Sequence, residues 1–444
     1  MQGNWHWVKY FFQEGQSMTS PLFTNVNPLA PEILACPHAF NQQLREQAPV
    51  YHCPVTGIYF VSDYDNVVAI AKNEKLFSNE FAQFQAGIEQ EEDPELDAIL
   101  KKGYRRVETM LKLDPPLQRR YRSLCQKPFS ANHVAKLQPY IQNLANELID
   151  DLINEGQCDW MTAFAVPMPV RMIAFILGVP LTDLDLFKQW SDASVYRFSA
   201  GKTREGALHA AQLTVDFQHY FADKIKARQI EPTDDVLSDI VNASVDGQHP
   251  MNLEECLSVI SQLLVAGNET TTSTFAEGMH LLATHPEQVQ LVQEDPSLIP
   301  NMVEEMLRLS TPTAQMWRIC KADTEVHGVR IPAGAAMMIK FASANRDANQ
   351  FPSPDRFDVT RKNLKAQIAF GQGVHHCLGA ALARQELITG FQVVLQRLTH
   401  FRLPEGAGPL EFLPSTLLHP PKPFTVLFDP RTESNGSKQP SPAL

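Results

Sequence analysis

The feature that most constrains the fold is a glycine-rich turn that delivers one cysteine, Cys377, to the start of an apolar, alanine-rich helix. Gly371 and Gly373 permit tight or positive-φ turns and the close approach of a flat ligand. The free amides that open the next helix stabilise negative sulfur, so the pattern predicts a depressed pKa for this thiol. An arbitrary cysteine is more often a buried free thiol. Here two glycines and a histidine two residues earlier favour a metal-bound thiolate.

Residues 370–384 resemble the cysteine-ligand loop of the cytochrome P450 superfamily, whose pattern is Phe-Gly-x-Gly-x-His-x-Cys-x-Gly, and they fill every fixed position of it. The resemblance implies that Cys377 is the axial thiolate of a non-covalently bound haem b, a ligand that pushes electron density toward O–O cleavage. It also implies that His375 reaches a haem propionate and that amides after the cysteine donate to the sulfur. The cofactor-binding positions implied by the loop are Phe370, Gly371, His375, Cys377 and Gly379.

Composition favours a single large domain. The chain has 444 residues, 44% of them hydrophobic, and no Pro/Gly/Ser-rich linker divides residues 25–430. We therefore expect one haem domain over 25–430, a poorly ordered N-terminal extension over 1–24 and a disordered tail over 431–444. The net charge of −12 argues against nucleic-acid binding, which needs a basic face.

The cysteines and the apolar runs predict the compartment. Seven cysteines lie scattered without close pairs, so they indicate no disulfide framework and favour a reducing cytoplasm. No Cys-x-x-Cys-His motif occurs, which excludes the signature of covalent c-type haem. Pro, Arg or Lys breaks each apolar run before it reaches membrane-spanning length. We expect a soluble, cytoplasmic protein without a membrane partner.

Hydrophobic periodicity predicts a mainly α fold with small β-sheets. Alternation predicts a β-hairpin over 48–62, and helical spacing runs through most of 118–309. The other predicted elements are a helix over 63–71, a solvated acidic loop over 87–97, strands within 324–341 and 401–428, and a helix over 378–398. This order fits the cytochrome P450 fold, which would place haem between the long central helix and the helix after the cysteine.

The long central helix is predicted from a cap and an apolar stripe. Asn252 followed by Glu255 forms a capping-box pattern, and apolar residues continue at helical spacing toward His285. In its middle, residues 266–271 read Ala-Gly-Asn-Glu-Thr-Thr, and glycine and threonine weaken a helix interior. Taken alone, this is a tolerated local defect. Together with the cysteine loop, it matches the P450 motif Ala/Gly-Gly-x-Asp/Glu-Thr.

The motif implies a division of work on the oxygen side of the haem. Ala266 and Gly267 would leave room for O₂ and substrate. Thr270 would hydrogen-bond the activated oxygen, and Glu269 would relay protons from solvent. Two protons on the distal oxygen release water, whereas a proton on the proximal oxygen releases hydrogen peroxide, so a hydroxyl can steer the outcome. Thr270 and Glu269 are therefore the expected catalytic residues.

Three further positions resemble propionate ligands, which need fixed positive charge and hydrogen-bond donors. Arg318 precedes a predicted strand. Gln118 stands where the family often has His, and Arg122 lies one helical turn later, so the two can point the same way. The alternative for each arginine is an ordinary surface charge. We favour the haem for Arg318 and Arg122.

Glu305 and Arg308 lie at i,i+3 and are neighbours on one helix face. Most such pairs are exposed salt bridges of little consequence. In the P450 pattern, however, Glu-x-x-Arg is completed by an Arg or His from a later loop, and we assign that third position to Arg356. The resemblance makes this trio structural, shaping the core on the haem side.

Electrons are expected from separate proteins. The sequence has neither the cysteine clusters of an iron–sulfur centre nor a Gly-x-Gly-x-x-Gly fingerprint. A ferredoxin and its NAD(P)H-dependent reductase are the expected partners. A basic patch is a candidate docking face for an acidic ferredoxin, although a solvated helix face explains the same residues equally well. The residues of this patch are Lys112, Arg119, Arg120 and Lys127.

Together these patterns predict a haem-thiolate monooxygenase that inserts one atom of O₂ into a small hydrophobic substrate, such as a terpenoid, steroid, fatty acid or aromatic compound. A haem-thiolate isomerase or peroxygenase and a non-catalytic haem-binding protein are the alternatives, and the Glu–Thr pair speaks against them. A zinc site at 375–377 lacks a second ligand cluster, and the sequence has no Gly-x-Ser-x-Gly elbow of a serine hydrolase. By resemblance, the substrate pocket is lined by Phe84, Val195, Phe198, Leu263, Ala266, Ala314, Met316 and Leu417.

Overall fold

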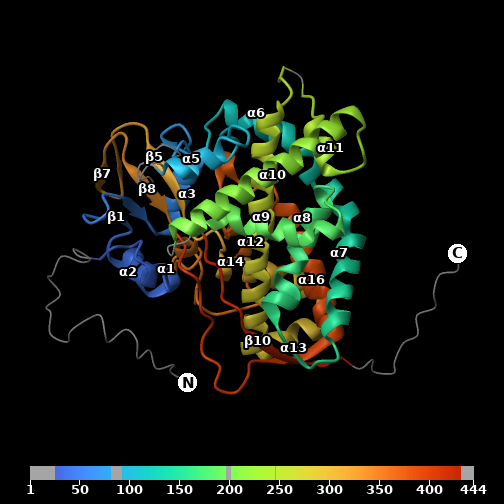
Figure 1. Ribbon diagram of the computed structural model, residues 1–444. Coiled ribbons are helices and arrows are strands. Elements are labelled where there is room, and N and C mark those ends of the chain that lie inside the picture. Colours follow the sequence, from blue (N-terminus) through green and yellow to red (C-terminus); the bar gives the residue numbers. More distant parts are fainter. Residues whose placement is uncertain (1–25, 82–92, 197–201, 246, 432–444) are drawn as a thin grey trace.

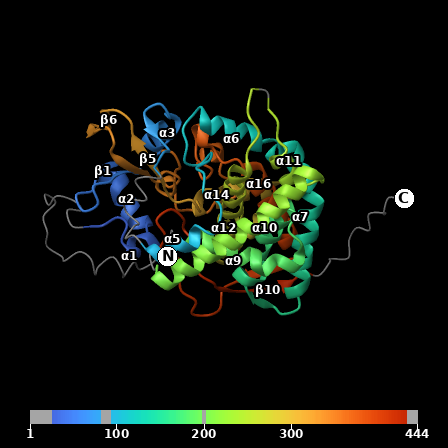
Figure 2. The ribbon, with the colours of Figure 1, turned by 45° about the horizontal axis from the view of Figure 1, so that its top comes forward.

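The structure, a computed structural model, describes residues 26–81, 93–196, 202–245 and 247–431. Figures 1 and 2 show the β-rich part on one side of the molecule and a larger helical body on the other. The predicted N-terminal extension, all but the first residue of the predicted tail, and two pocket candidates lie outside the described residues. These two candidates are Phe84 and Phe198.

Helices dominate the described chain, as the sequence predicts. In chain order they are α1 (Pro31–Ala35), α2 (His38–Gln47), α3 (Tyr64–Lys72), α5 (Pro94–Leu100), α6 (Leu117–Cys125), α7 (Ala131–Leu152), α8 (Pro167–Ile176), α9 (Leu184–Tyr196), α10 (Arg204–Ile230), α11 (Val236–Val241), α12 (Leu253–Thr284), α13 (Pro286–Glu294), α14 (Ile299–Ser310), α15 (Phe341–Ala344) and α16 (Ala380–Arg397). Among the described residues, no helix has both the length and the apolar character needed to cross a membrane.

The strands are short and form three sheets. They are β1 (Val50–His52), β2 (Tyr59–Val61), β3 (Phe77–Ser78), β4 (Gln157–Asp159), β5 (Met316–Cys320), β6 (Thr324–Val326), β7 (Val329–Ile331), β8 (Ala336–Ile339), β9 (Leu398–Arg402) and β10 (Thr425–Pro430). The largest sheet has the order β1-β2-β8-β5-β3, in which only β2 and β8 run parallel. The hairpin predicted over 48–62 is confirmed as the antiparallel β1–β2 pair. The order β4-β10-β9 forms a second sheet, and β6 pairs with β7.

Part of the predicted acidic loop is helical. Residues 82–92 lie outside the described part of the chain, and α5 begins at Pro94. Asp93 accepts hydrogen bonds from the backbone amides of Glu95 and Leu96. An aspartate N-cap followed by proline at the first helical position is a strong helix start. The prediction of a solvated loop rested on the negative charges and did not take this helix cap into account.

The central helix α12 starts and ends where its sequence predicts. The side chain of Asn252 accepts from the amide of Glu255, and the Glu255 carboxylate accepts from the amide of Asn252, both at 2.9 Å. Glycine then sets how closely α12 meets α16. A Cβ at Gly278 would lie 2.6 Å from Phe391, and one at Gly390 would lie 2.7 Å from Phe275. Helices α12 and α16, which should enclose the cofactor, are therefore in close contact near these two glycines.

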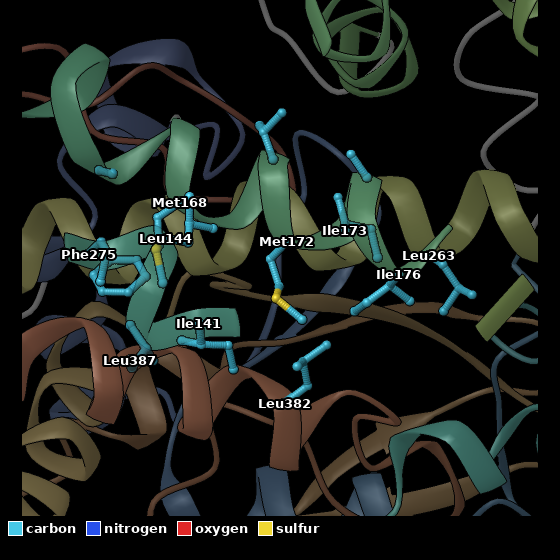
Figure 3. Close-up of a cluster of buried hydrophobic side chains, with 14 of the residues drawn as sticks. Ile141, Leu144, Met168, Met172, Ile173, Ile176, Leu263, Phe275, Leu382 and Leu387 are labelled. Atoms are coloured by element: carbon cyan, nitrogen blue, oxygen red, sulfur yellow. The ribbon is translucent and has the colours of Figure 1, made fainter. Parts of the chain in front are cut away.

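The main apolar core joins these two helices to α7 and α8. Figure 3 shows side chains from all four helices converging. Each fully buried aliphatic or aromatic side chain contributes about 1.5–3 kcal/mol relative to its exposed state. The labelled residues of this core are Ile141, Leu144, Met168, Met172, Ile173, Ile176, Leu263, Phe275, Leu382 and Leu387.

Candidate functional site

The cysteine loop is a tight turn held against α3. Gly371 and Gly373 have φ values of 68° and 74°, a region that favours glycine. A Cβ at Gly373 would also collide with the carbonyl oxygen of Ala71. The amide of Cys377 donates to the carbonyl of Phe370 at 2.9 Å and closes the turn. The sequence thus places Cys377 at a fixed position just before α16.

The electrostatics around the sulfur differ from the prediction. Burial raises the pKa of the Cys377 thiol, against the opposing effects of the Gly379 amide and the charges of Arg122 and Arg384. The predicted depressed pKa is therefore wrong for the protein without metal, because desolvation outweighs one amide and two guanidinium groups. A coordinating metal removes that proton outright. Arg384 also lies over the Phe370 ring, 4.4 Å from its centroid.

Side chains of helix α6 donate hydrogen bonds to backbone carbonyls of the cysteine loop. The Gln118 side-chain amide donates to the carbonyl of Val374 at 2.8 Å. Arg122 donates to the carbonyl of His376 at 2.7 Å. The Gln118 bond uses one of the two N–H groups of its side-chain amide, so its donation to a propionate stays a prediction. The buried Oε1 of Gln118 has no hydrogen-bond partner among the described residues. Both α6 residues do lie at the loop, in a bracing arrangement.

Two buried groups near the loop fit an anionic ligand. Arg318 is buried, forms no salt bridge with any residue that the structure describes, and donates to the carbonyl of Trp317. Burial lowers the pKa of Arg318 to about 10. The buried Nε2 of His375 has no hydrogen-bond partner within the part of the chain that the structure describes, and the pKa of His375 is lowered to about 4 by burial and then by Arg318. A buried charge is costly unless it is paired, so Arg318 fits the carboxylates of a haem. A carboxylate beside His375 would favour the protonated ring, whose Nε2 would then be a donor.

The two small residues in the middle of α12 have different surroundings: Ala266 leaves space beside the helix, whereas Gly267 packs against α8. Ala266 is exposed although it lies at the centre of a core helix, and a flat cofactor or a substrate would cover it. A Cβ at Gly267 would lie 3.2 Å from Ile173, which already approaches from α8. The Thr270 hydroxyl donates to the carbonyl of Ala266 at 2.8 Å, so its lone pairs stay available as acceptors.

Glu269 turns toward α9. Burial raises the pKa of its carboxyl, whereas the charge of Lys188 and a hydrogen bond with Ser191 lower it and Asp192 raises it. These three α9 residues share one helix face at i, i+3 and i+4. The sequence analysis missed them. The only available signal was this spacing of polar residues within the predicted helix.

The structural trio needs one correction. Arg308 donates to both Glu305 oxygens at 2.7 and 2.8 Å. The third partner is Arg361, whose Nε lies 3.0 Å from Glu305 Oε1. Arg356 has an exposed side chain and contributes only its backbone carbonyl, which accepts from Arg308 and Arg361. The assignment of the Arg356 side chain is therefore wrong, because that side chain faces solvent.

Some pocket candidates lie together. The amide of Ala314 donates to the carbonyl of Leu417 at 2.9 Å, and Met316 and Leu417 pack in one apolar cluster. Leu263 belongs to the core of Figure 3, near Ile176 of α8. Val195 is half-buried near the end of α9.

The predicted basic patch is only half available. Lys112 is buried and pairs with Glu108, and Arg120 forms a 2.7 Å salt bridge with Glu255. Arg119 and Lys127 have exposed side-chain fractions of 67% and 70%. A docking face at this position therefore has two accessible cations instead of four. Lys112 and Arg120 therefore no longer belong to the candidate docking face.

Comparison with known proteins gives a consistent result. The family model "Cytochrome P450" matches residues 184–428. A steroid C26-monooxygenase of Mycobacterium tuberculosis (strain CDC 1551 / Oshkosh) is 34% identical over 87% of this chain and 99% of its own. A vitamin D(3) 25-hydroxylase of Pseudonocardia autotrophica is 35% identical over 73% of this chain and 78% of its own. The structure of CYP109Q5 from Chondromyces apiculatus has a TM-score of 0.81 and 32% identity, covering 92% of this chain and all of that one.

Proposed function

The chain belongs to the cytochrome P450 family and is a haem-dependent monooxygenase, and on that premise we propose how its own residues divide the work. The overall reaction consumes a substrate R–H, O₂, two electrons and two protons, and yields R–OH and water. When bound, the haem supplies electron transfer to O₂ and cleavage of the O–O bond. Cys377 would be the residue that ligates its iron, and the middle of α12 would lie beside it.

Arg318 and His375 would hold the haem propionates. The observation that carries this assignment is a buried guanidinium that has no salt bridge within the described residues, close to a buried imidazole nitrogen that has no hydrogen-bond partner among them. Gln118 and Arg122 act on the haem site indirectly, through their hydrogen bonds to carbonyls of the cysteine loop. They keep the loop in the conformation that presents the sulfur.

Glu269 and Thr270 deliver protons. Burial raises the pKa of Glu269, which makes its carboxyl a better proton carrier near neutral pH. Lys188 and Asp192 pair on the outer part of α9 and connect this acid to solvent. The Thr270 hydroxyl, one residue further along α12, donates its own proton to the Ala266 carbonyl, so it would accept a hydrogen bond on the oxygen side of the haem and fix the position of the delivered proton. This pair favours a monooxygenase over an isomerase or a peroxygenase, which need no such delivery.

The substrate is a hydrophobic molecule held between α12, the end of α9 and the turn that carries Ala314 and Leu417. The candidate lining is apolar, and the named relatives act on a steroid and on vitamin D(3). We therefore put steroid-like and terpenoid molecules first and fatty acids and aromatic compounds second. A library of these compounds, screened for a shift of the Soret band, tests this order.

Electrons come from a separate ferredoxin and its NAD(P)H-dependent reductase. Arg119 and Lys127 are the accessible cations of the candidate docking face. The enzyme acts in the cytoplasm; all seven cysteines are free, which fits a reducing compartment.

The decisive test of the proposed function is spectroscopic. The dithionite-reduced protein with CO should show the red-shifted Soret band of a thiolate-bound haem. Cys377→Ser should lose that band. A normal band in Cys377→Ser would assign the metal to another residue and overturn the proposal.

A further inference from the structure

A buried chain of hydrogen bonds links α9 to α12 beside the proton-delivering acid. The Asn268 amide donates to the Ser191 hydroxyl oxygen at 2.6 Å. The Thr272 hydroxyl donates to Asn268 Oδ1 at 3.4 Å. The same Asn268 amide also lies 3.5 Å from Glu269 Oε1, so the Ser191 hydroxyl and the Glu269 carboxyl meet at one amide. The Ser191 hydroxyl favours the charged form of that carboxyl. Ser191 lies outside the motifs that identify the family, and Asn268 fills the variable position of the α12 motif.

Because these groups are buried, each hydrogen bond between them has one defined donor and one defined acceptor. Ser191 and Asn268 have exposed fractions of 0% and 1%, so water does not compete for their hydrogen bonds. A hydroxyl has one proton and two lone pairs. Because Asn268 donates to the Ser191 oxygen, the single Ser191 proton is left for the Glu269 carboxylate. Hydrogen bonds aligned in this way strengthen one another, and they hold the carboxylate against α9.

The same face of α9 carries a candidate substrate contact. Ser191 and Val195 lie one helical turn apart, and α9 packs directly on α12, as Figure 1 shows. The charged groups that face Glu269 are Lys188 and Asp192, also on α9. Any displacement of α9 by a bound molecule must therefore change the surroundings of the acid.

We propose that Ser191 is a positioning residue for Glu269: oriented by Asn268, its hydroxyl fixes the acid and ties proton delivery to the helix that contacts the substrate. This inference rests on the proposed function of Glu269 and deepens it. Ser191 touches neither the haem nor the oxygen. Its effect is on where the carboxyl points and when it releases its proton.

The test compares Ser191→Ala with a matched control on the same helix. Ser194→Ala removes a hydroxyl that donates to the carbonyl of Trp190 at 2.8 Å and does not contact Glu269. The haem-loaded proteins are turned over with NADPH, a plant-type ferredoxin, its reductase and testosterone as the probe. The readouts are hydrogen peroxide formed per NADPH and the effect of D₂O on NADPH oxidation. Haem content and the CO spectrum verify folding.

Ser191→Ala should raise the peroxide ratio by about two- to tenfold, the equivalent of one lost hydrogen bond of roughly 0.5–1.5 kcal/mol. It should also enlarge the D₂O effect, because proton transfer becomes slower. Asn268→Ala, which removes the orienting donor from the other helix, should shift both readouts in the same direction and provides the test if Ser191→Ala loses haem. Ser194→Ala should match the wild type.

Glu269→Gln separates failure of this inference from failure of the proposed function. If Glu269→Gln raises the peroxide ratio while Ser191→Ala and Asn268→Ala behave like Ser194→Ala, the role of Ser191 is refuted and that of the acid stands. If Glu269→Gln itself leaves both readouts at wild-type values, the proposed proton delivery fails, and the inference fails with it.

Discussion

Arg361 donates to Glu305 across 3.0 Å, and Arg308 donates to the same carboxylate from its own helix. All three charged side chains are buried. The remaining guanidinium donors reach backbone carbonyls, including that of Arg356. A buried ion cluster is tolerated only when its hydrogen-bonding groups are satisfied. One carboxylate therefore ties α14 to the loop that leads into the cysteine turn.

Removing Arg361 should destabilise the protein strongly. Arg361→Ala breaks a buried charged pair and leaves carbonyls without donors, which costs about 3–5 kcal/mol. Arg356→Ala is the matched control, since it removes an exposed side chain and keeps the carbonyl, and should stay within about 0.5 kcal/mol of the wild type. Urea unfolding of the haem-loaded proteins measures both. A larger loss in Arg356→Ala would restore the assignment made from sequence.

A buried acid should make stability fall as pH rises. Burial raises the pKa of Glu277 to about 8, with only a partial opposing effect of Arg346, and its Oε1 has no partner in the described part of the chain. In the unfolded chain a glutamate titrates near about 4.3. Between these values the native state keeps a proton that the unfolded state has lost, so the free energy of unfolding decreases with rising pH.

Glu277→Gln should remove that dependence. The variant should gain stability over the wild type between pH 5 and pH 8, by up to about 1.4 kcal/mol per pH unit. Urea unfolding at the two pH values measures the gain. Glu287→Gln, on the exposed surface of α13, should show the same difference from the wild type at both. A gain of Glu277→Gln that is equal at pH 5 and pH 8 would contradict the pKa on which the prediction rests.

The parts of the site that sequence could predict are those fixed by local chemistry. The Asn252 cap needs only a residue three positions later. The cysteine turn needs glycines at two positive-φ positions, and the weakened centre of α12 is visible in its Ala-Gly and Thr residues. Each of these signals lies within a few consecutive residues. The cap and the turn reappear in the structure, whereas α12 runs as an unbroken helix from Leu253 to Thr284 despite its small and threonine residues.

The rest depends on three-dimensional burial that no local pattern carries. Arg356 and Arg361 lie five residues apart in an irregular loop, and only packing decides which one faces inward. The direction of the Cys377 pKa depends on how much water the fold removes. The hydrogen bond from the Gln118 amide to the Val374 carbonyl joins two segments far apart in the sequence. Ser191 is an ordinary serine in an amphipathic helix until α12 is placed against it.

Losing the Thr270 hydroxyl should redirect electrons without disturbing the haem. We expect Thr270→Ala to keep the CO band and to convert most of its NADPH consumption into hydrogen peroxide. Thr284→Ala is a close control, because Thr284 makes the same bond to the carbonyl four residues earlier, His280, at the far end of α12. Peroxide and product are measured per NADPH. Unchanged product yield in Thr270→Ala would remove this residue from proton delivery.

Arg318 should have opposite effects on the free and the haem-loaded protein. Without an anion, its buried charge costs desolvation free energy that no salt bridge within the described residues returns. Arg318→Met should therefore raise the stability of the haem-free protein by about 1–4 kcal/mol. With haem, the same change removes a charge-assisted bond to a propionate, so haem should dissociate at least tenfold faster. Melting curves of both forms and haem transfer to apomyoglobin measure the two effects. A loss of stability in both forms would mean that Arg318 serves packing, and that the propionates are held elsewhere.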